Sequence, residues 1–144
     1  MFSCDATKRI FKRFDMMEND IIDIPSVKQA LYLLNIQPGD HLQHMIDLFC
    51  QNKEQVSIEE FTQMVYVLQT ANMEDEASVL FFLGDKDRNG KMPRHSAIEM
   101  LTNLGFRMRS GTLGDIVDQF SLFQSEELDE QSFKKMLEFL LSLE

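Results

Sequence analysis

Four apolar residues recur along the chain at nearly constant spacing, and this repeat limits the possible folds more than any other feature. They are Ile22, Val56, Met92 and Leu128, separated by 34, 36 and 36 residues. In all four cases the residues 5, 8, 9 and 12 positions further on are also apolar. This spacing places side chains on one face of an α-helix. The sequence therefore predicts four similar units, each ending in an amphipathic helix.

A second apolar pattern precedes the repeated residues. Before Ile22 it consists of Ile10, Phe11 and Phe14, and it recurs in large part in the third and fourth units. In the second unit the pattern lies one residue closer, so that unit has lost a residue between its helices. Each unit is then a helix, a loop of roughly 12 residues that holds the repeated apolar residue, and a second helix.

A polar stretch at 69–78 separates two halves of the chain. One helix–loop–helix unit cannot bury its own apolar face, so we expect the units to pair within each half. A lobe of about 70 residues buries only ~60% of its unfolded surface, so each lobe gains stability from a bound partner. The expected parts are an N-terminal lobe at 1–70 with loops at about 15–26 and 50–60, a linker at 71–78, and a C-terminal lobe at 79–144 with loops at about 85–96 and 121–132.

Charge and composition exclude several classes of function. The net charge is −10 and the pI about 4.7, which argues against nucleic-acid binding through phosphate contacts and favours a basic partner. Two cysteines do not make a disulfide framework. No apolar run reaches the ~18 residues of a membrane span, and no signal peptide is evident. No catalytic constellation is visible. We expect a soluble, cytoplasmic, non-enzymatic protein that is monomeric when free.

The sequence resembles the EF-hand superfamily, in particular four-handed proteins of the calmodulin, troponin C and myosin light-chain type. The resemblance implies an all-α fold of two lobes, each a pair of EF-hand units joined by a short β-bridge between their loops. It implies that Ile22 pairs with Val56, and Met92 with Leu128. The residues on which the resemblance rests are Phe14-Asp15 entering loop one, Glu60-Phe61 leaving loop two, Asp85-x-Asp87-x-Asn89-Gly90 in loop three, and Thr102-Asn103-Leu104-Gly105 after the third unit.

Three of the four loops lack the side chains that calcium requires. Ca²⁺ takes about 6–8 oxygens, and an EF-hand loop supplies them from positions 1, 3, 5, 7 and 9 and a bidentate Glu at 12. Loop one has Met17 at position 3 and Ser26 at position 12. Loop two is one residue short and brings Lys53 into the site, and loop four has Phe123 and Ser132 at positions 3 and 12. We expect none of these loops to bind the metal.

Loop three keeps the first half of a calcium site. Asp85, Asp87 and Asn89 offer side-chain oxygens and Lys91 a backbone carbonyl, but Ser96 replaces the closing glutamate. That set falls short of a sensor site. We expect at most weak Ca²⁺ or Mg²⁺ binding there, and no other cofactor.

Retention of the scaffold without the metal is typical, within this superfamily, of myosin light chains, especially the essential type. The resemblance therefore implies a calcium-independent light chain, associated with the cytoskeleton, that wraps an amphipathic basic IQ-type helix of a myosin heavy chain. Among the predicted groove residues, Leu31, Phe61 and Leu101 fit a core position better than a contact position, whereas Met108 and Phe139 fit contact best. The predicted groove residues are Leu31, Leu34, Met45, Phe61 and Met64 in the first lobe, and Met100, Leu101, Met108, Met136 and Phe139 in the second.

Two other functions remain open. One is a divergent calmodulin-like calcium sensor that regulates an enzyme or channel, and the other is a scaffold or apolar-ligand protein unrelated to motors. A cluster of basic residues on the first helix also has two interpretations: a solvated helix face, or a contact with the motor or an acidic partner. The cluster is Lys8, Arg9, Lys12 and Arg13.

Overall fold

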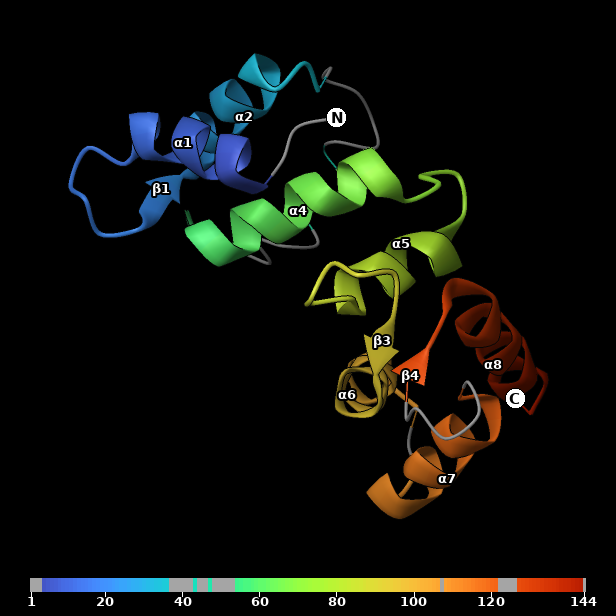
Figure 1. The fold of residues 1–144 in the computed structure, drawn as a ribbon. Coiled ribbons are helices and arrows are strands. Elements are labelled where there is room, and N and C mark those ends of the chain that lie inside the picture. The colour runs from blue at the N-terminus through green and yellow to red at the C-terminus, as the bar shows by residue number, and fades with distance from the viewer. Residues whose placement is uncertain are drawn as a thin grey trace. The chain divides into compact units, whose positions relative to one another are not determined.

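The computed structural model covers the 144-residue chain and describes residues 4–36, 43, 47, 54–106, 108–121 and 127–143. Helices dominate, and the strands are only two or three residues long (Figure 1). The elements are α1 (Cys4–Phe14), β1 (Ile21–Asp23), α2 (Ile24–Leu33), β2 (Gln55–Ser57), α4 (Ile58–Thr70), α5 (Glu76–Gly84), β3 (Met92–Pro93), α6 (Arg94–Asn103), α7 (Ser110–Phe120), β4 (Glu127–Leu128) and α8 (Glu130–Ser142).

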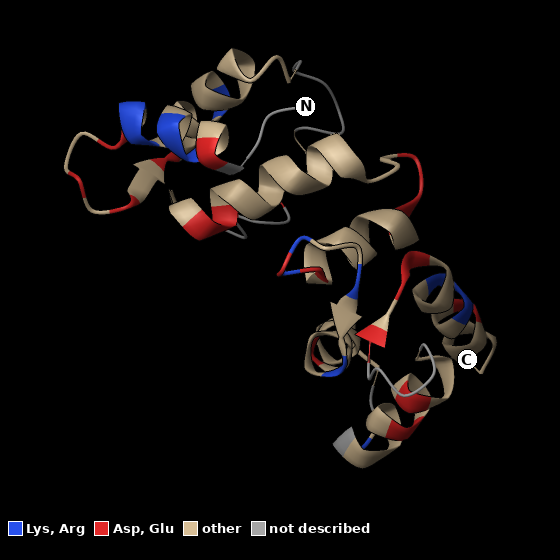
Figure 2. Ribbon diagram, viewed as in Figure 1, with Lys and Arg blue, Asp and Glu red and all other residues tan. Residues whose placement is uncertain are grey.

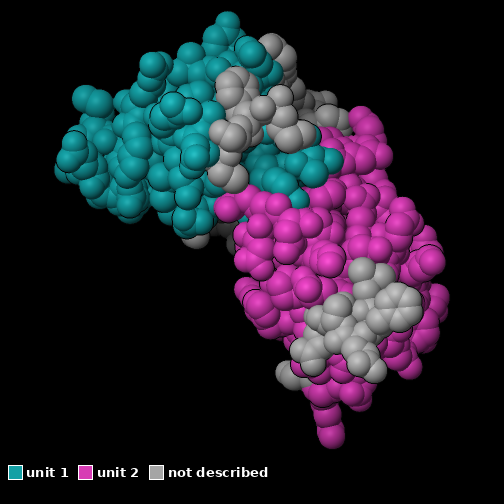
Figure 3. Space-filling view, viewed as in Figure 1, with its two compact units in different colours: residues 1–70 teal, residues 71–144 magenta. Residues whose placement is uncertain are grey.

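The chain divides into two compact units, residues 1–70 and residues 71–144 (Figure 3). Each unit has its own two-stranded antiparallel bridge and its own buried core. Most of the helix expected before loop two falls on residues outside the described part. Residues 43 and 47 of that stretch are described, and both are helical.

In unit 1 the bridge joins β1 to β2 with Ile22 opposite Val56, the pair that the EF-hand resemblance implies. Both side chains are buried. The core around them includes the fully buried rings of Phe11 from α1 and Phe61 from α4, whose centroids lie 5.5 Å apart. The bridge thus holds the two loops together at one end while the helices enclose the apolar side chains.

Unit 2 repeats this arrangement. Met92 of β3 lies opposite Leu128 of β4, again the expected pair, and both are fully buried. The rings of Phe81 from α5 and Phe133 from α8 lie 5.9 Å apart in the core. The predicted fold is confirmed: the protein is all-α, with two lobes of paired helices and a short β-bridge in each.

The helices of the described residues are at most 13 residues long. None of them is both long enough and apolar enough to cross a bilayer.

Candidate functional site

Loops one and three are held by the same hydrogen bonds, although only one of them has a conventional sequence. In loop one, Asp15 accepts bonds from the backbone amides of Asn19 (3.2 Å) and Asp20 (2.8 Å). In loop three, Asp85 accepts bonds from the amides of Asn89 (3.2 Å) and Gly90 (2.8 Å). Both aspartates are buried. Each first-position carboxylate therefore has amide donors on both oxygens and organises its loop without an ion.

The turn in loop one is achieved without glycine. Gly90 has φ +83° in loop three, whereas Asp20 takes the equivalent position in loop one with φ +61°. Aspartate is among the few residues that visit this left-handed region. The Lys12 ammonium pairs with the Asp20 carboxylate and lies 4.0 Å from Asp15 Oδ2. The hydrogen bond to Asp20 raises the pKa of Lys12 above its ordinary value.

Two of the exit helices begin with an aspartate at loop position 9 that caps the amide of the serine at position 12, where an EF-hand has its closing glutamate. Asp23 accepts a bond from the Ser26 amide at 2.9 Å, and Asp129 accepts one from the Ser132 amide at 2.8 Å. Hydrogen bonds from Ser26 and Ser132 lower the pKa of the respective aspartates. Such caps satisfy amide groups that the helix itself leaves unpaired. The serine at position 12 therefore belongs to a helix cap.

Glu60, the closing glutamate of loop two, is also part of a cap. Its carboxylate accepts a bond from the Ser57 amide at 3.2 Å, and the Ser57 hydroxyl accepts one from the Glu60 amide at 3.1 Å. This reciprocal pair is a capping box at the start of α4. The start of the same loop, residues 50–53, lies outside the described residues.

The described residues of the loops offer few ligands to a divalent cation. Within the described ranges, no three His, Cys, Asp or Glu side chains converge so that they could hold a metal ion. In loop three the side-chain oxygen of Asn89 accepts a bond from the Lys91 amide at 3.0 Å, and Asp87 is exposed. Ser96 is 7% exposed and brings no carboxylate. Residues 122–126 of loop four are outside the described part. The prediction of weak binding at loop three stays a prediction.

Unit 2 has an apolar groove of about 420 Å³ with charged residues around it. Leu104 and Phe106 follow α6, while Leu137 and Leu141 are one helical turn apart on α8. Leu104 is 42% exposed and Leu141 58% exposed. The complete lining is Asp75, Glu76, Ala77, Leu80, Leu104, Phe106, Lys134, Leu137, Glu138 and Leu141. The groove therefore offers accessible apolar surface beside carboxylates.

A charge network fixes one side of this groove. The Lys134 ammonium lies 2.8 Å from Asp75 Oδ2 and 3.2 Å from Glu130 Oε1. Asp75 also caps α5 by accepting a bond from the Ala77 amide at 3.0 Å. The ion pair lowers the pKa of Asp75 and raises the pKa of Lys134. Glu76 and Glu138 remain exposed at the groove.

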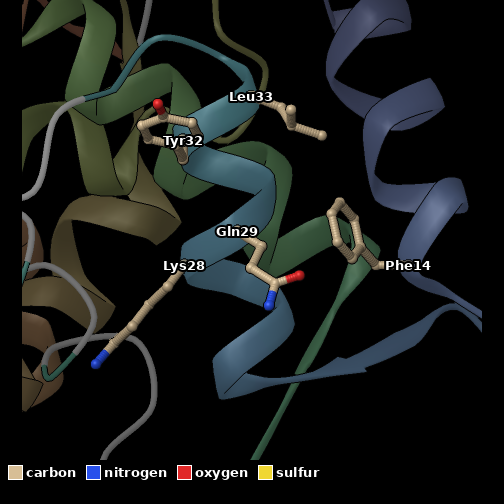
Figure 4. A pocket seen from close by; sticks show the side chains of 5 residues that line it. All are labelled: Phe14, Lys28, Gln29, Tyr32 and Leu33. Carbon is tan, nitrogen blue, oxygen red and sulfur yellow. The ribbon is translucent and has the colours of Figure 1, made fainter.

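Unit 1 has a smaller recess of about 340 Å³ between the end of α1 and the outer face of α2. Its lining is Phe14, Lys28, Gln29, Tyr32 and Leu33. Figure 4 shows the Phe14 ring and the Leu33 side chain on the same side of α2, with the Lys28 side chain extending away from them. Tyr32 is 65% exposed and Leu33 45% exposed. This apolar surface is therefore accessible in the described structure.

The groove residues expected from sequence mostly belong to the core. Burial prevents contact with a partner in this conformation for six of them: Leu31, Leu34, Phe61, Met64, Leu101 and Met136. Met100 and Met108 are half-buried, and Phe139 is 39% exposed with its ring 5.7 Å from that of Phe120. Met45 lies outside the described residues. None of the predicted residues is among those that line the groove of unit 2.

Two features of the sequence could have indicated the observed groove of unit 2: a helix-ending glycine and a pair of leucines on one helix face. Leu104 and Phe106 flank Gly105, whose φ of +93° is typical of a residue that ends a helix. Leu137 and Leu141 have the i, i+4 spacing of one helix face. Leu104 and Leu137 appear in the repeat, but the repeat does not distinguish a groove position from a core position.

Comparison with known proteins adds no family to these observations. No protein-family model matches the chain, and no curated protein is found as a relative. The paired helices and two-stranded bridges are consistent with EF-hand-like lobes.

Proposed function

We propose that this protein is a non-catalytic, calmodulin-like light chain that binds an amphipathic basic helix of IQ type, such as that of a myosin lever arm, without needing calcium. The observation that carries the proposal is the groove of unit 2, where exposed leucines lie beside exposed carboxylates. An amphipathic helix buries its apolar face in such a groove. Its Arg and Lys residues would meet Glu76 and Glu138.

Metal independence is supported by the way the exit helices begin. In sensor EF-hands, calcium binding opens the lobe. Here Asp23, Asp129 and the pair of Ser57 and Glu60 satisfy amides at the helix starts. These helix starts are therefore held without an ion, and position 12 of loops one, three and four supplies a serine in place of the closing glutamate. A partner helix bound all the time is therefore favoured over a partner recruited by calcium.

The test is a titration of the full chain with a labelled IQ-type peptide in excess chelator, followed by fluorescence anisotropy. We expect saturable binding, and little change in affinity when calcium replaces the chelator. Leu141→Asp should weaken binding at least about tenfold, because it places a charge in the groove. Leu143→Asp is the matched control, since Leu143 is equally exposed (57%) but does not line the groove.

Loss of peptide binding in chelator, or equal effects of the two substitutions, would contradict the proposal. A second candidate is a divergent calcium sensor of an enzyme or channel, favoured by the intact turn of Asp85 and Gly90 in loop three. Calorimetry separates the two functions. Saturable calcium binding at micromolar concentrations, with peptide binding that requires it, would support the sensor.

A further inference from the structure

The basic residues of unit 1 are concentrated on one helix. Residues 1–70 hold six basic and ten acidic side chains, yet α1 alone has four of the basic ones and a single acidic residue, Asp5. Figure 2 shows the blue of Lys and Arg gathered along α1. The four follow the spacing i, i+1, i+4 and i+5, which places them on one side of the helix. They are Lys8, Arg9, Lys12 and Arg13.

Among the described residues, most of this charge has no ion-pair partner. Lys12 is engaged with Asp20 and Asp15 of loop one. Across the described ranges, no carboxylate forms an ion pair with Lys8, Arg9 or Arg13. Arg9 and Arg13 are exposed. The positive electrostatic potential of these exposed side chains attracts negatively charged groups of other molecules, although the protein as a whole is acidic.

An apolar recess adjoins the basic helix. Phe14 directly follows Arg13 and lines the recess with Leu33 and Tyr32, while Lys28 contributes another exposed ammonium from α2. The volume of about 340 Å³ suits one large apolar side chain and is at the low end for ligand pockets. Lys28 is therefore a lining residue whose ammonium extends away from the Phe14 ring, and Arg13 adjoins the recess through its chain neighbour Phe14.

The geometry points to a second docking surface in unit 1, formed by Arg9, Arg13 and Lys28 around the Phe14–Tyr32–Leu33 recess, which binds an acidic peptide segment with an aromatic or large aliphatic anchor. This surface goes beyond the proposed function, because it lies in the other unit and has the opposite charge preference. A partner protein bound here would be held together with the basic helix bound by unit 2.

A peptide fits this surface better than a membrane does. Glu18 and Asp20 are exposed in the loop that follows α1, and an anionic bilayer would repel them. Residues 1–70 also have an excess of acidic side chains. An extended peptide can contact Arg9, Arg13 and Lys28 while avoiding the carboxylates of loop one.

The experiment titrates the full chain into a fluorescein-labelled peptide of glutamates with one central phenylalanine. We expect saturable binding that weakens with salt, and weaker binding when alanine replaces that phenylalanine. The double variant Arg9→Glu/Arg13→Glu should weaken binding at least about tenfold. Leu33→Ser and Lys28→Glu should each weaken it too, and they test the surface through a different helix if the double variant unfolds. Circular dichroism verifies folding.

The controls separate this surface from the groove of unit 2. Lys135→Glu, at an exposed position on α8, and Leu141→Asp should leave binding of the acidic peptide unchanged. Absence of binding by the wild-type chain, equal binding by wild-type and Arg9→Glu/Arg13→Glu chains, or preference for phosphatidylserine-containing vesicles over the peptide would each overturn the inference.

Discussion

The side chains of Ser57 and Glu60 bond to each other's backbone amides, with the Ser57 amide 3.2 Å from Glu60 Oε1 and the Glu60 amide 3.1 Å from the Ser57 hydroxyl. The one loop-closing glutamate that the sequence retains is thus used to start α4. With the aspartate caps of α2 and α8, this pair shows how an EF-hand-like frame can persist when its loops lack metal ligands. Local side-chain bonds organise helix starts that an ion would otherwise help to fix.

The capping box leads to the first prediction. Glu60→Ala should lower the free energy of unfolding by about 1 kcal/mol, since it removes an acceptor at the start of α4. Glu60→Gln should largely preserve stability because glutamine also serves in this motif. Urea denaturation of the full chain measures both variants. Glu59→Ala removes a neighbouring charge from the same turn. If it costs as much as Glu60→Ala, capping is not the reason for the loss.

The turn of loop three gives the second prediction. Gly90 has φ +83°, and a Cβ atom added there would meet no atom within 4 Å. Gly90→Ala should therefore destabilise the protein by about 1–2 kcal/mol through backbone conformation alone. Gly111 lies in α7 with equally open surroundings and no positive φ. Gly111→Ala should stabilise it by about 0.5–1 kcal/mol. Thermal melts of the two variants should shift in opposite directions. If Gly90→Ala stabilised the protein, residue 90 would not need the left-handed backbone conformation that the turn of loop three gives it.

The sequence predicted the frame of each lobe because that frame repeats. Ile22, Val56, Met92 and Leu128 stand out by recurring in phase, and the EF-hand resemblance implies that they form the bridges, as the structure shows. Asp20 takes the left-handed turn of loop one with φ +61°, a region that aspartate tolerates.

The groove of unit 2 is less predictable from the sequence than the frame of the lobes, for a physical reason. Periodicity identifies which helix face is apolar. It does not distinguish Leu101 from Leu137, which hold equivalent positions in the repeat but have different neighbours in the fold. Leu101 is fully buried, whereas Leu137 reaches the groove. Exposure depends on how the helix ends meet in space, and Phe106 joins the groove from outside the repeat. The pairing of Lys134 with Asp75 is similarly a contact between distant parts of the sequence.

Loop three also allows a prediction about metal binding. The wild-type chain should show no saturable calcium binding tighter than about millimolar, because Ser96 provides no bidentate carboxylate. Ser96→Glu would add that ligand to the oxygens of Asp85, Asp87 and Asn89, and should raise calcium affinity at least about tenfold. Isothermal calorimetry measures it. Ser132→Glu in loop four is the matched control and should gain little, since Phe123 stands at position 3. Equal gains in both variants would indicate unspecific binding.

The link between Asp75 and Lys134 predicts a dependence of stability on pH. The pKa of Asp75 lies below its ordinary 3.8, so its contribution is complete above that value and is lost as pH falls through the lowered pKa. The pKa of Lys134 lies above 10.5, so its contribution is lost only as pH rises through the raised value.

Melting temperatures measured from neutral pH to about pH 2 should fall less steeply for Asp75→Asn than for wild type. Asp115→Asn, at an exposed position on α7, is the control. Parallel curves for wild type and Asp75→Asn would rule out this pair as a source of acid sensitivity.

The close approach of Gly84 to Met92 gives the last prediction. A Cβ atom at Gly84 would clash with Met92 Cε, and Met92 is fully buried as half of the bridge pair with Leu128. Gly84→Ala should therefore destabilise the protein by about 1–3 kcal/mol, because an overpacked core must shift. Met92→Val removes the atoms that clash and is destabilising by itself, since it shortens a buried side chain. The double variant should be more stable than the sum of the two losses implies, as contacting residues are not additive. Urea denaturation of the four chains gives the coupling energy. A value near zero would show that Gly84 accommodates a methyl group without moving Met92.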